Sequence, residues 1–306
     1  MKLTTLIAAG LLIVYPANAL AQRDFSEIEI TTQEVAPGVY MLQGAGGNIG
    51  LSTGPDGAFM IDDQFAPLSA KILAAIAKVS DEPVKFLVNT HWHGDHSGGN
   101  EAFADRGAVI IAHENVRTRL KEGLKRASGE TPPAPYASLP VITFSDSVNF
   151  YWNGQSINVR HPAPAHTDGD AIISFRPANV VHMGDTFFNG AYPYIDIESG
   201  GDLDGVIAAH EATLGEIDDN TKIIPGHGPL SAKKDLERYL AMLKDVRARV
   251  QALVDSGLDE NAAVKADPLK DLNGEWGTGF IDGEAMTRAA YRSLTRNKTQ
   301  APTKGR

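Results

Sequence analysis

Four side chains of types that commonly bind metals lie close together in this sequence. His91, His93, Asp95 and His96 fall within six consecutive positions, directly after an apolar run that predicts a buried strand. Alternate side chains of an extended segment share one face, so the first three can converge while His96 points elsewhere. This arrangement favours two metal ions over one, and Gly94 would permit the sharp turn that such a cluster needs.

Three further motifs place potential ligands beside short apolar strands. His166 begins a His-Thr-Asp-Gly-Asp run, Asp185 ends a His-Met-Gly-Asp run, and His227 lies within Pro-Gly-His-Gly-Pro. One sheet edge could gather all three beside the first cluster. A histidine-rich surface loop is the plainer interpretation of that cluster, but it leaves these motifs unexplained. The chain has no cysteine, so a metal here would be bound by histidines and carboxylates.

These motifs resemble those of the metallo-β-lactamase-fold hydrolases, over roughly Val35 to Pro229. The His-x-His-x-Asp-His run is that superfamily's hallmark, and the downstream His, Asp and His occur in its order. The resemblance implies an enzyme with two zinc ions per chain. The ligands that it implies are His91, His93 and His166 for the first zinc, Asp95, His96 and His227 for the second, and Asp185 as the bridge.

The bridging position separates branches of this family. Asp185 stands where glyoxalase II-like members carry a carboxylate and where the best-known β-lactamase subclass carries a cysteine. Asp62 matches a family acid that supports a ligand histidine, although a turn-initiating aspartate is an equal alternative. Iron also binds imidazole and carboxylate. The resembling iron members carry Glu where His93 stands, so zinc is expected.

The chemistry expected of such a centre is hydrolysis. Zinc lowers the pKa of bound water from about 15.7 to about 7, which provides a metal-bound hydroxide that can attack a carbonyl. Asp95 is the predicted catalytic residue, because it would orient that nucleophile as well as bind metal. A Ser/His/Asp triad is the competing mechanism, but the sequence lacks the Gly-x-Ser-x-Gly motif.

A β-lactam amide is the first substrate expectation, because these drugs act outside the cytoplasm and the chain begins like an exported protein. Phe188 opposes it, since β-lactamases of the cysteine subclass carry a substrate-binding lysine there. A glyoxalase II-like thioester or ester hydrolase is the alternative, and Asp185 favours it. A non-catalytic periplasmic zinc-binding protein is the third, although metal storage would not require a bridging carboxylate.

The N-terminus predicts a periplasmic or secreted protein. Met1-Lys2 precede an apolar run over 3–17, and a small-x-small site follows at 19–21, so residues 1–21 are expected to be a signal peptide. The net charge of −10, without basic clusters, opposes nucleic acid and anionic membranes as partners. A small-molecule substrate remains the expected partner, with no membrane association after cleavage. Nothing in the sequence specifies an oligomeric state.

Strands and then helices occur twice along the chain. This order predicts an α/β fold, a four-layer αββα sandwich of two mixed β-sheets flanked by helices. A single hydrolase domain is expected over 22–296, with a helical part over 231–296 and a disordered tail over 297–306. Strands are predicted at 28–32, 38–43, 58–61, 84–88, 108–112, 141–144, 155–159, 171–175, 180–183 and 222–224. Helices are predicted at 67–79, 99–105, 114–125, 202–214, 231–254 and 283–294, and a loop at 127–139.

Several residues near the motifs have weaker interpretations. Residues 44–48 form a predicted flexible hairpin tip that could close over substrate. The loop side chains of Asn189, Tyr192 and Tyr194 could line a pocket or belong to an ordinary loop. The histidines outside the motifs are His113, a helix cap or packing residue; His161, in a loop; His182, a potential support for a ligand; and His210, within an amphipathic helix.

Overall fold

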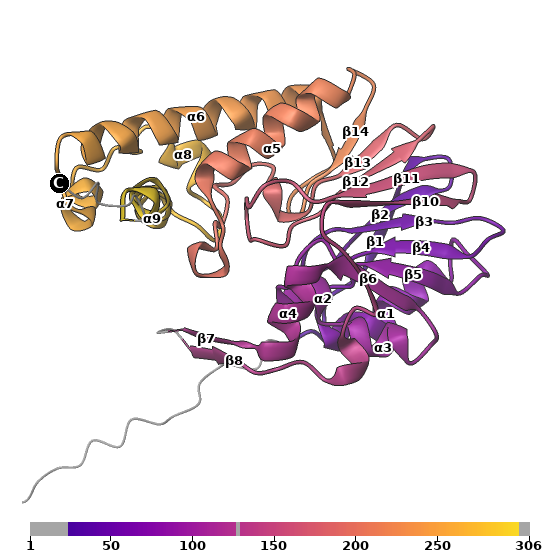
Figure 1. The fold of residues 1–306 in the computed structure, drawn as a ribbon. Helices are drawn as coiled ribbons and strands as arrows, with labels where there is room; N and C mark the ends of the chain where they lie inside the picture. Colours follow the sequence, from indigo (N-terminus) through magenta and orange to yellow (C-terminus); the bar gives the residue numbers. More distant parts are fainter. Residues whose placement is uncertain (1–23, 127–128, 300–306) are drawn as a thin grey trace, which may run out of the picture.

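The structure is a computed structural model that describes residues 24–126 and 129–299 of the chain. Two β-sheets lie face to face, with helices on both outer sides (Figure 1). The predicted four-layer αββα sandwich is therefore confirmed. The predicted signal peptide lies outside the described residues. Within the described ranges, no helix has both the length and the apolar character needed to cross a bilayer.

The first sheet has seven strands in the order β1-β2-β3-β4-β5-β6-β9. Strands β1 to β4 are antiparallel, whereas β4, β5, β6 and β9 run parallel. The carboxyl ends of the parallel strands meet at one edge, which is where open α/β sheets bind ligands. The strands are β1 (Thr31–Ala36), β2 (Val39–Gln43), β3 (Ile49–Ser52), β4 (Ala58–Ile61), β5 (Val84–Val88), β6 (Val109–His113) and β9 (Ile142–Phe144).

The second sheet has six strands in the order β10 to β15. All neighbours are antiparallel except β13 and β14, which are parallel and direct their following loops to the same edge. Separately, β7 (Leu124–Arg126) and β8 (Gly129–Thr131) form a small hairpin. The strands of the second sheet are β10 (Ser147–Trp152), β11 (Gln155–Arg160), β12 (Ile172–Arg176), β13 (Val180–His182), β14 (Lys222–Ile224) and β15 (Ser231–Ala232).

Helices cover the outer face of each sheet. The first sheet is covered by α1 (Ser69–Ile76), α3 (Asn100–Ala104) and α4 (Glu114–Glu122), and the second by α5 (Leu203–Glu216) and α6 (Lys233–Asp255). Helix α9 (Gly283–Thr299) packs against α5 and α6. Figure 1 shows α6 and α9 extending beyond the sandwich, on the same side as the β7–β8 hairpin. The shorter helices are η1 (Ala66–Leu68), α2 (Gly94–Ser97), η2 (Tyr136–Ser138), η3 (Gly184–Thr186), η4 (Ile197–Ser199), α7 (Glu260–Lys265) and α8 (Asn273–Trp276).

The described residues form four buried clusters, three large ones and a small one around Trp92, Ala112 and Val116, which hold these layers together. Between the sheets, side chains such as Phe59 and Val88 meet Phe175 and Val180 of the second sheet. A second core lies under α1 and α3, and the third joins the outer face of β13 to α5, α6 and α9. The hydrophobic effect at about 25 cal/mol per Å² makes these interfaces the main source of stability. The rigid sheets therefore fix the loops at their ends.

Most predicted elements are present, with shifts of a few residues. The first strand lies at Thr31–Ala36 rather than 28–32, because pairing with β2 begins at Thr31 and continues to Ala36. The predicted loop over 127–139 is wrong in part, since it contains β8 and η2. Strands β3 and β10 were not predicted. Gly50 weakens the strand pattern of β3, whereas β10 does carry the alternating β-branched and aromatic residues of a strand, and Phe150 and Trp152 pack against the core between the sheets. Helix α9 continues to Thr299, into the tail expected to be disordered.

Candidate metal centre

The loop after β5 carries the first cluster of predicted ligands. His91 lies in a bend after this strand, and His93 has extended backbone; α2 then begins at Gly94 and carries Asp95 and His96. The expected sharp turn at Gly94 is wrong. Its φ is not among the positive values, and a Cβ there would meet no atom within 4 Å. The start of α2, rather than a glycine turn, separates the directions of these side chains.

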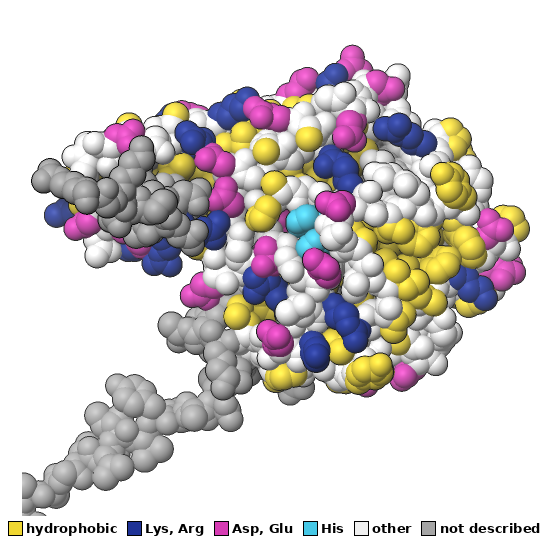
Figure 2. Space-filling model, in the orientation of Figure 1, with side chains coloured by type: hydrophobic (Ala, Val, Ile, Leu, Met, Phe, Trp, Pro, Cys, Tyr) yellow, Lys and Arg dark blue, Asp and Glu magenta, His cyan; other side chains and the backbone are white. Residues whose placement is uncertain are grey.

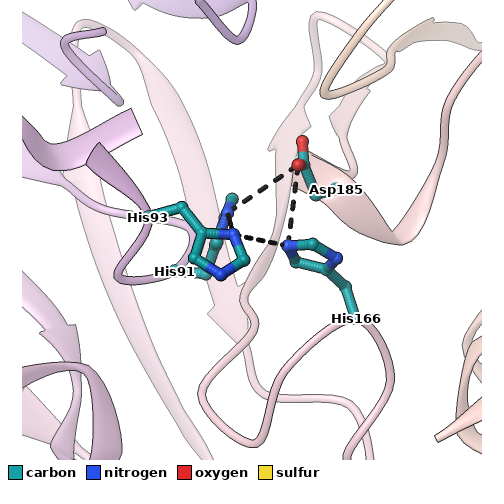
Figure 3. Close-up of side chains that lie close together, drawn as sticks. All are labelled: His91, His93, His166 and Asp185. Atoms are coloured by element: carbon teal, nitrogen blue, oxygen red, sulfur yellow. Dashed lines mark hydrogen bonds and ion pairs between the residues drawn. The ribbon is translucent and has the colours of Figure 1, made fainter. Parts of the chain in front are cut away.

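Three imidazoles from two loops face one another in the first group of ligands (Figure 3). The Nδ1 of His93 lies 3.1 Å from His91 Nε2 and 3.0 Å from His166 Nε2. Asp185 follows β13 and approaches from the second sheet, with its Oδ2 at 3.8 Å from His91 Nε2 and 3.6 Å from His166 Nε2. Four potential ligand atoms therefore converge within 4.8 Å of one another.

The second group consists of Asp95, His96 and His227, whose ligand atoms also lie within 4.8 Å of one another. The two Nε2 atoms of His96 and His227 are 3.3 Å apart, and Asp95 Oδ2 lies 3.7 Å and 3.4 Å from them. The second oxygen of Asp185, Oδ1, lies 3.0 Å from His96 Nε2 and 3.4 Å from His227 Nε2. Asp185 thus faces both groups, one oxygen to each.

Comparison with known proteins agrees with this geometry. The family model described as "Metallo-beta-lactamase superfamily" matches residues 39–227, which include most strands of both sheets and all seven candidate ligands. The chain belongs to the metallo-β-lactamase superfamily. The family and the two His/Asp groups together indicate a metal-dependent hydrolase.

The relatives of this superfamily member include two named hydroxyacylglutathione hydrolases. One, from Nitrosococcus oceani, is 29 % identical over 197 residues, which cover 60 % of this chain and 66 % of the relative. The other, from a Polaromonas species, is 29 % identical over 214 residues, covering 67 % and 71 %. The first alignment thus spans slightly less than two thirds of the relative's length.

Solved metallo-β-lactamases share the fold. The metallo-beta-lactamase from Pontibacter korlensis superimposes with a TM-score of 0.59 at 21 % identity, covering 71 % of this chain and all of that one. FIM-1 from Pseudomonas aeruginosa gives 0.57 at 19 %, covering 71 % and 95 %. At such identities the likeness establishes the architecture of the superfamily.

The imidazoles fit a metal because their outer nitrogens are already hydrogen-bonded. His93 Nε2 lies 2.9 Å from Asp196 Oδ2, and His166 Nδ1 lies 2.6 Å from the backbone oxygen of Tyr194. His96 Nδ1 is 2.8 Å from Asp62 Oδ2. Each acceptor holds a proton on the outer nitrogen, so the inner nitrogen presents a lone pair to the centre. This is the tautomer that a metal-binding histidine needs.

The electrostatics of the first group and of Asp185 also match what a metal requires. Burial lowers the pKa of His91 well below its usual value and that of His166 to about 4, so both imidazoles are neutral near pH 7. Burial opposes ionisation of Asp185, but neighbouring His96 and His227 bring the pKa of its carboxyl well below the usual value. Neutral imidazoles and ionised carboxylates are the protonation states that bind metal ions. In the second group, burial opposes protonation, but neighbouring Asp185 raises the pKa of His96 well above its usual value and that of His227 to about 9. A metal ion there would therefore displace protons from these two imidazoles.

Asp62 lies behind the second group, as the sequence indicated. Its carboxylate is fully buried and accepts hydrogen bonds from the backbone N and the Oγ1 of Thr90, each at 2.7 Å, as well as from His96. Its φ of 60° is in the left-handed region, which non-glycine residues adopt mainly where the surroundings enforce it. Asp62 therefore connects the ends of β4 and β5 to a ligand, rather than initiating an exposed turn.

Sequence reasoning missed Asp196. Its carboxyl group is buried, holds His93, and also accepts from the backbone N of Ser199. Together with the carbonyl of Tyr194 it makes one short segment, residues 194–196, that orients two ligands of the first group. No local pattern marks Asp196, since it lies 103 positions from His93.

Of the loop side chains that could line a pocket, one lies at the candidate metal centre and two do not. Tyr194 does contact the ligands, with its ring 5.8 Å from those of His93 and His166. Tyr192 is buried in the core under the C-terminal helices, and Asn189 donates to Ser231 Oγ at 2.8 Å. Tyr192 and Asn189 therefore stabilise the fold and do not line the metal centre. The tip at residues 44–48 is also anchored rather than free, since it forms backbone hydrogen bonds with the loops that carry the ligands.

The histidines outside the motifs have structural roles. His113 caps α4, as predicted, by accepting from the backbone N of Asn115, and it stacks on His161 at 4.0 Å. His182 is hydrogen-bonded to the backbone oxygen of Asn48, at 2.9 Å, so it holds the hairpin tip rather than a ligand.

Proposed function

We propose that this chain is a dinuclear zinc hydrolase that cleaves a carbonyl–heteroatom bond. The observation that carries the proposal is the position of Asp185 between the two groups. Its Oδ2 faces the imidazoles of His91 and His166, and its Oδ1 faces those of His96 and His227. A carboxylate shared in this way supports a pair of ions rather than one.

Zinc bound here would supply a nucleophilic water at neutral pH and polarise the substrate carbonyl. His91, His93 and His166 would hold the first ion, and Asp95, His96 and His227 the second. Burial opposes ionisation of Asp95, yet His96 and His227 lower its pKa to about 2, so it is a carboxylate at neutral pH. Its side chain is 27 % exposed, so it can accept a hydrogen bond from the attacking water and orient it.

An ester or thioester is the substrate class that we favour. The carboxylate bridge and the two relatives named hydroxyacylglutathione hydrolase support it. Phe188 stacks on His227 with ring centroids 5.1 Å apart and planes within 11°, so this position presents an aromatic face, not a cation, to substrate. A β-lactam, the first expectation from the sequence, would need another anchor for its carboxylate, and we retain it as the second candidate.

We also propose that the chain is exported. The support is the N-terminal pattern over residues 1–21, and the test is fractionation of the native host with immunodetection. A periplasmic or secreted form shortened by about 21 residues is expected. Full-length protein confined to the cytoplasm would contradict export, without affecting the proposed chemistry.

The function is tested by counting bound metal and assaying three substrates on the same preparation. We expect about two zinc ions per chain, turnover of an alkyl thioester and an ester, and slower turnover of a chromogenic cephalosporin. Asp185→Asn should lose one ion and most turnover, because a neutral amide cannot bridge two cations. Cephalosporin turnover alone would reverse the order of our candidates. Two bound ions with no turnover of any substrate would favour the non-catalytic zinc-binding alternative.

A further inference from the structure

A cavity of about 290 Å³ lies beside the metal centre, between the segment 193–198 and the helix α9. We call it the α9 pocket. Much of its wall is apolar and comes from Ile197, Ile281, Ala285 and Ala289. A cavity of this size can accept a chain of several carbons or an aromatic ring.

The α9 pocket is lined by four charged side chains, those of Asp196, Glu198, Arg288 and Arg292, and the two arginines pair with glutamates that lie outside this lining. Arg288 contacts Glu260 at 3.1 Å and Glu284 at 2.9 Å, and Arg292 contacts Glu260 at 2.8 Å. Two arginines and two glutamates compensate each other, so the pocket presents no net cation for a carboxylate or phosphate. Its chemistry therefore favours an uncharged apolar group.

The wall of the α9 pocket is also the support of the metal ligands. Tyr194 and Asp196 line the pocket, and they are the residues that hold His166 and His93. Because the ring of Tyr194 lies 5.8 Å from both of these imidazoles, a group seated in the pocket is close to the first group of ligands. Figure 2 shows histidine exposed at the surface, with hydrophobic side chains beside it on the side of the C-terminal helices.

Phe280 extends this apolar surface into solvent. Its ring is 89 % exposed and meets Tyr194 edge-on, with centroids 6.1 Å apart. An aromatic side chain so exposed adds little to folding, whereas exposed aromatics that become covered on binding dominate recognition. Phe280 is therefore placed to close over a ligand rather than to fill a core.

We propose that Tyr194, Phe280 and the α9 pocket bind an uncharged apolar group of the substrate, an alkyl or aryl acyl chain, whose carbonyl lies at the metal centre. The inference rests on the proposed hydrolase function, because it names the substrate class of that site. Discrimination between a short and a long acyl chain follows from the apolar area that the pocket covers.

The test compares acetyl and octanoyl esters of the same alcohol, with zinc-loaded full-length protein. We expect the octanoyl ester to be preferred in kcat/KM by at least about tenfold, since each buried CH₂ contributes about 0.8 kcal/mol. Phe280→Ala and the pocket-filling Ala289→Phe should each lower kcat/KM for the octanoyl ester about tenfold and leave the acetyl ester within about twofold. Tyr151→Ala is the matched control, because that ring is 80 % exposed on β10, in the second sheet.

Two measurements separate failure of this inference from failure of the proposed function. Equal kcat/KM for both esters, or equal losses on both in Phe280→Ala, would overturn the acyl pocket while leaving a hydrolase. If the wild-type chain cleaves neither ester, the pocket is tested directly by calorimetry with octanamide. Binding that is about tenfold weaker in Phe280→Ala supports the pocket, and no binding, or binding unaffected by this substitution, overturns it.

Discussion

Replacing Asp62 with Asn should remove metal from the second group without removing any ligand. In the structure Oδ1 of Asp62 accepts from the backbone N of Thr90, and Oδ2 accepts from both Thr90 Oγ1 and His96 Nδ1. An amide has one oxygen, so its NH₂ group must face one of these sets of donors. If the NH₂ group faced the backbone N–H of Thr90, two hydrogen-bond donors would meet at the 2.7 Å separation now occupied by a hydrogen bond.

If the NH₂ group of the amide faced His96 instead, it would donate to Nδ1 and so reverse the tautomer of the His96 imidazole. His96 Nδ1 would then become an acceptor, and the proton would move to Nε2, which lies 3.0 Å from Asp185 Oδ1 at the centre. A protonated Nε2 cannot bind metal. Partners of metal ligands typically contribute 10- to 100-fold to affinity, so we expect a loss of about 1.4–2.8 kcal/mol in zinc binding at this group. Unfolding stability should fall by about 1–3 kcal/mol through the unmatched buried donor.

The assay is zinc titration against a chromophoric chelator, with unfolding followed in parallel. Asp63→Asn is the matched control. Asp63 is as buried as Asp62, but it faces Gly99 N at 2.7 Å, and burial raises the pKa of its carboxyl well above the usual value. A protonated carboxyl and an amide are nearly isosteric, so this variant should keep both ions. Wild-type zinc affinity in Asp62→Asn, or equal losses in both variants, would refute the tautomer argument.

Three further predictions concern different contacts. Gly47→Ala should remove zinc from the second group, since a Cβ at this position would lie 2.0 Å from His96 Cε1. Gly94→Ala, within the His-x-His-x-Asp-His motif itself, should retain zinc, because a Cβ there would meet no atom within 4 Å. Atomic absorption measures the zinc content of both variants. Asp196→Asn should lower the metal affinity of the first group about 10- to 100-fold and leave that of the second group unchanged. Chelator competition with the cobalt-substituted protein can measure the two affinities separately. An equal loss of affinity at both groups would contradict this prediction. His210 is fully buried, and burial lowers its pKa from 6.5 to about 4, so the folded chain binds fewer protons than the unfolded chain below pH 6.5 and stability falls as the pH drops towards 4. Between pH 7.5 and pH 5, the free energy of unfolding of His210→Phe, measured with urea, should therefore fall by about 2 kcal/mol less than that of the wild type. An equal fall in both proteins would show that His210 is not responsible for this pH dependence.

Much of the fold followed from local patterns. Helix α6 was predicted from its apolar face, and strands β5 and β14 from short apolar runs that end at a motif. Strand β3 was not, because Gly50 interrupts its pattern, and β10 was overlooked although Ser147–Trp152 carries the alternation and the aromatic residues of a strand. Likewise Gly94 was assigned a turn from its identity alone, although the surrounding backbone starts a helix there.

The sequence by itself determined the seven candidate ligands, because four are adjacent in the chain and three lie in distinctive short motifs at strand ends. It also identified Asp62, through the resemblance to a family. The resemblance implied how these side chains divide into two groups, whereas the distances within each group and the position of Asp185 between them come from the tertiary structure, in which the two sheets bring Asp185 to the loop after β5. Only the structure could place Asp196 and the backbone oxygen of Tyr194 against the candidate ligands His93 and His166, and Phe280 against the ring of Tyr194. Such contacts join segments about a hundred residues apart, and their geometry is fixed by the packing of α9 and the sheets rather than by any local preference.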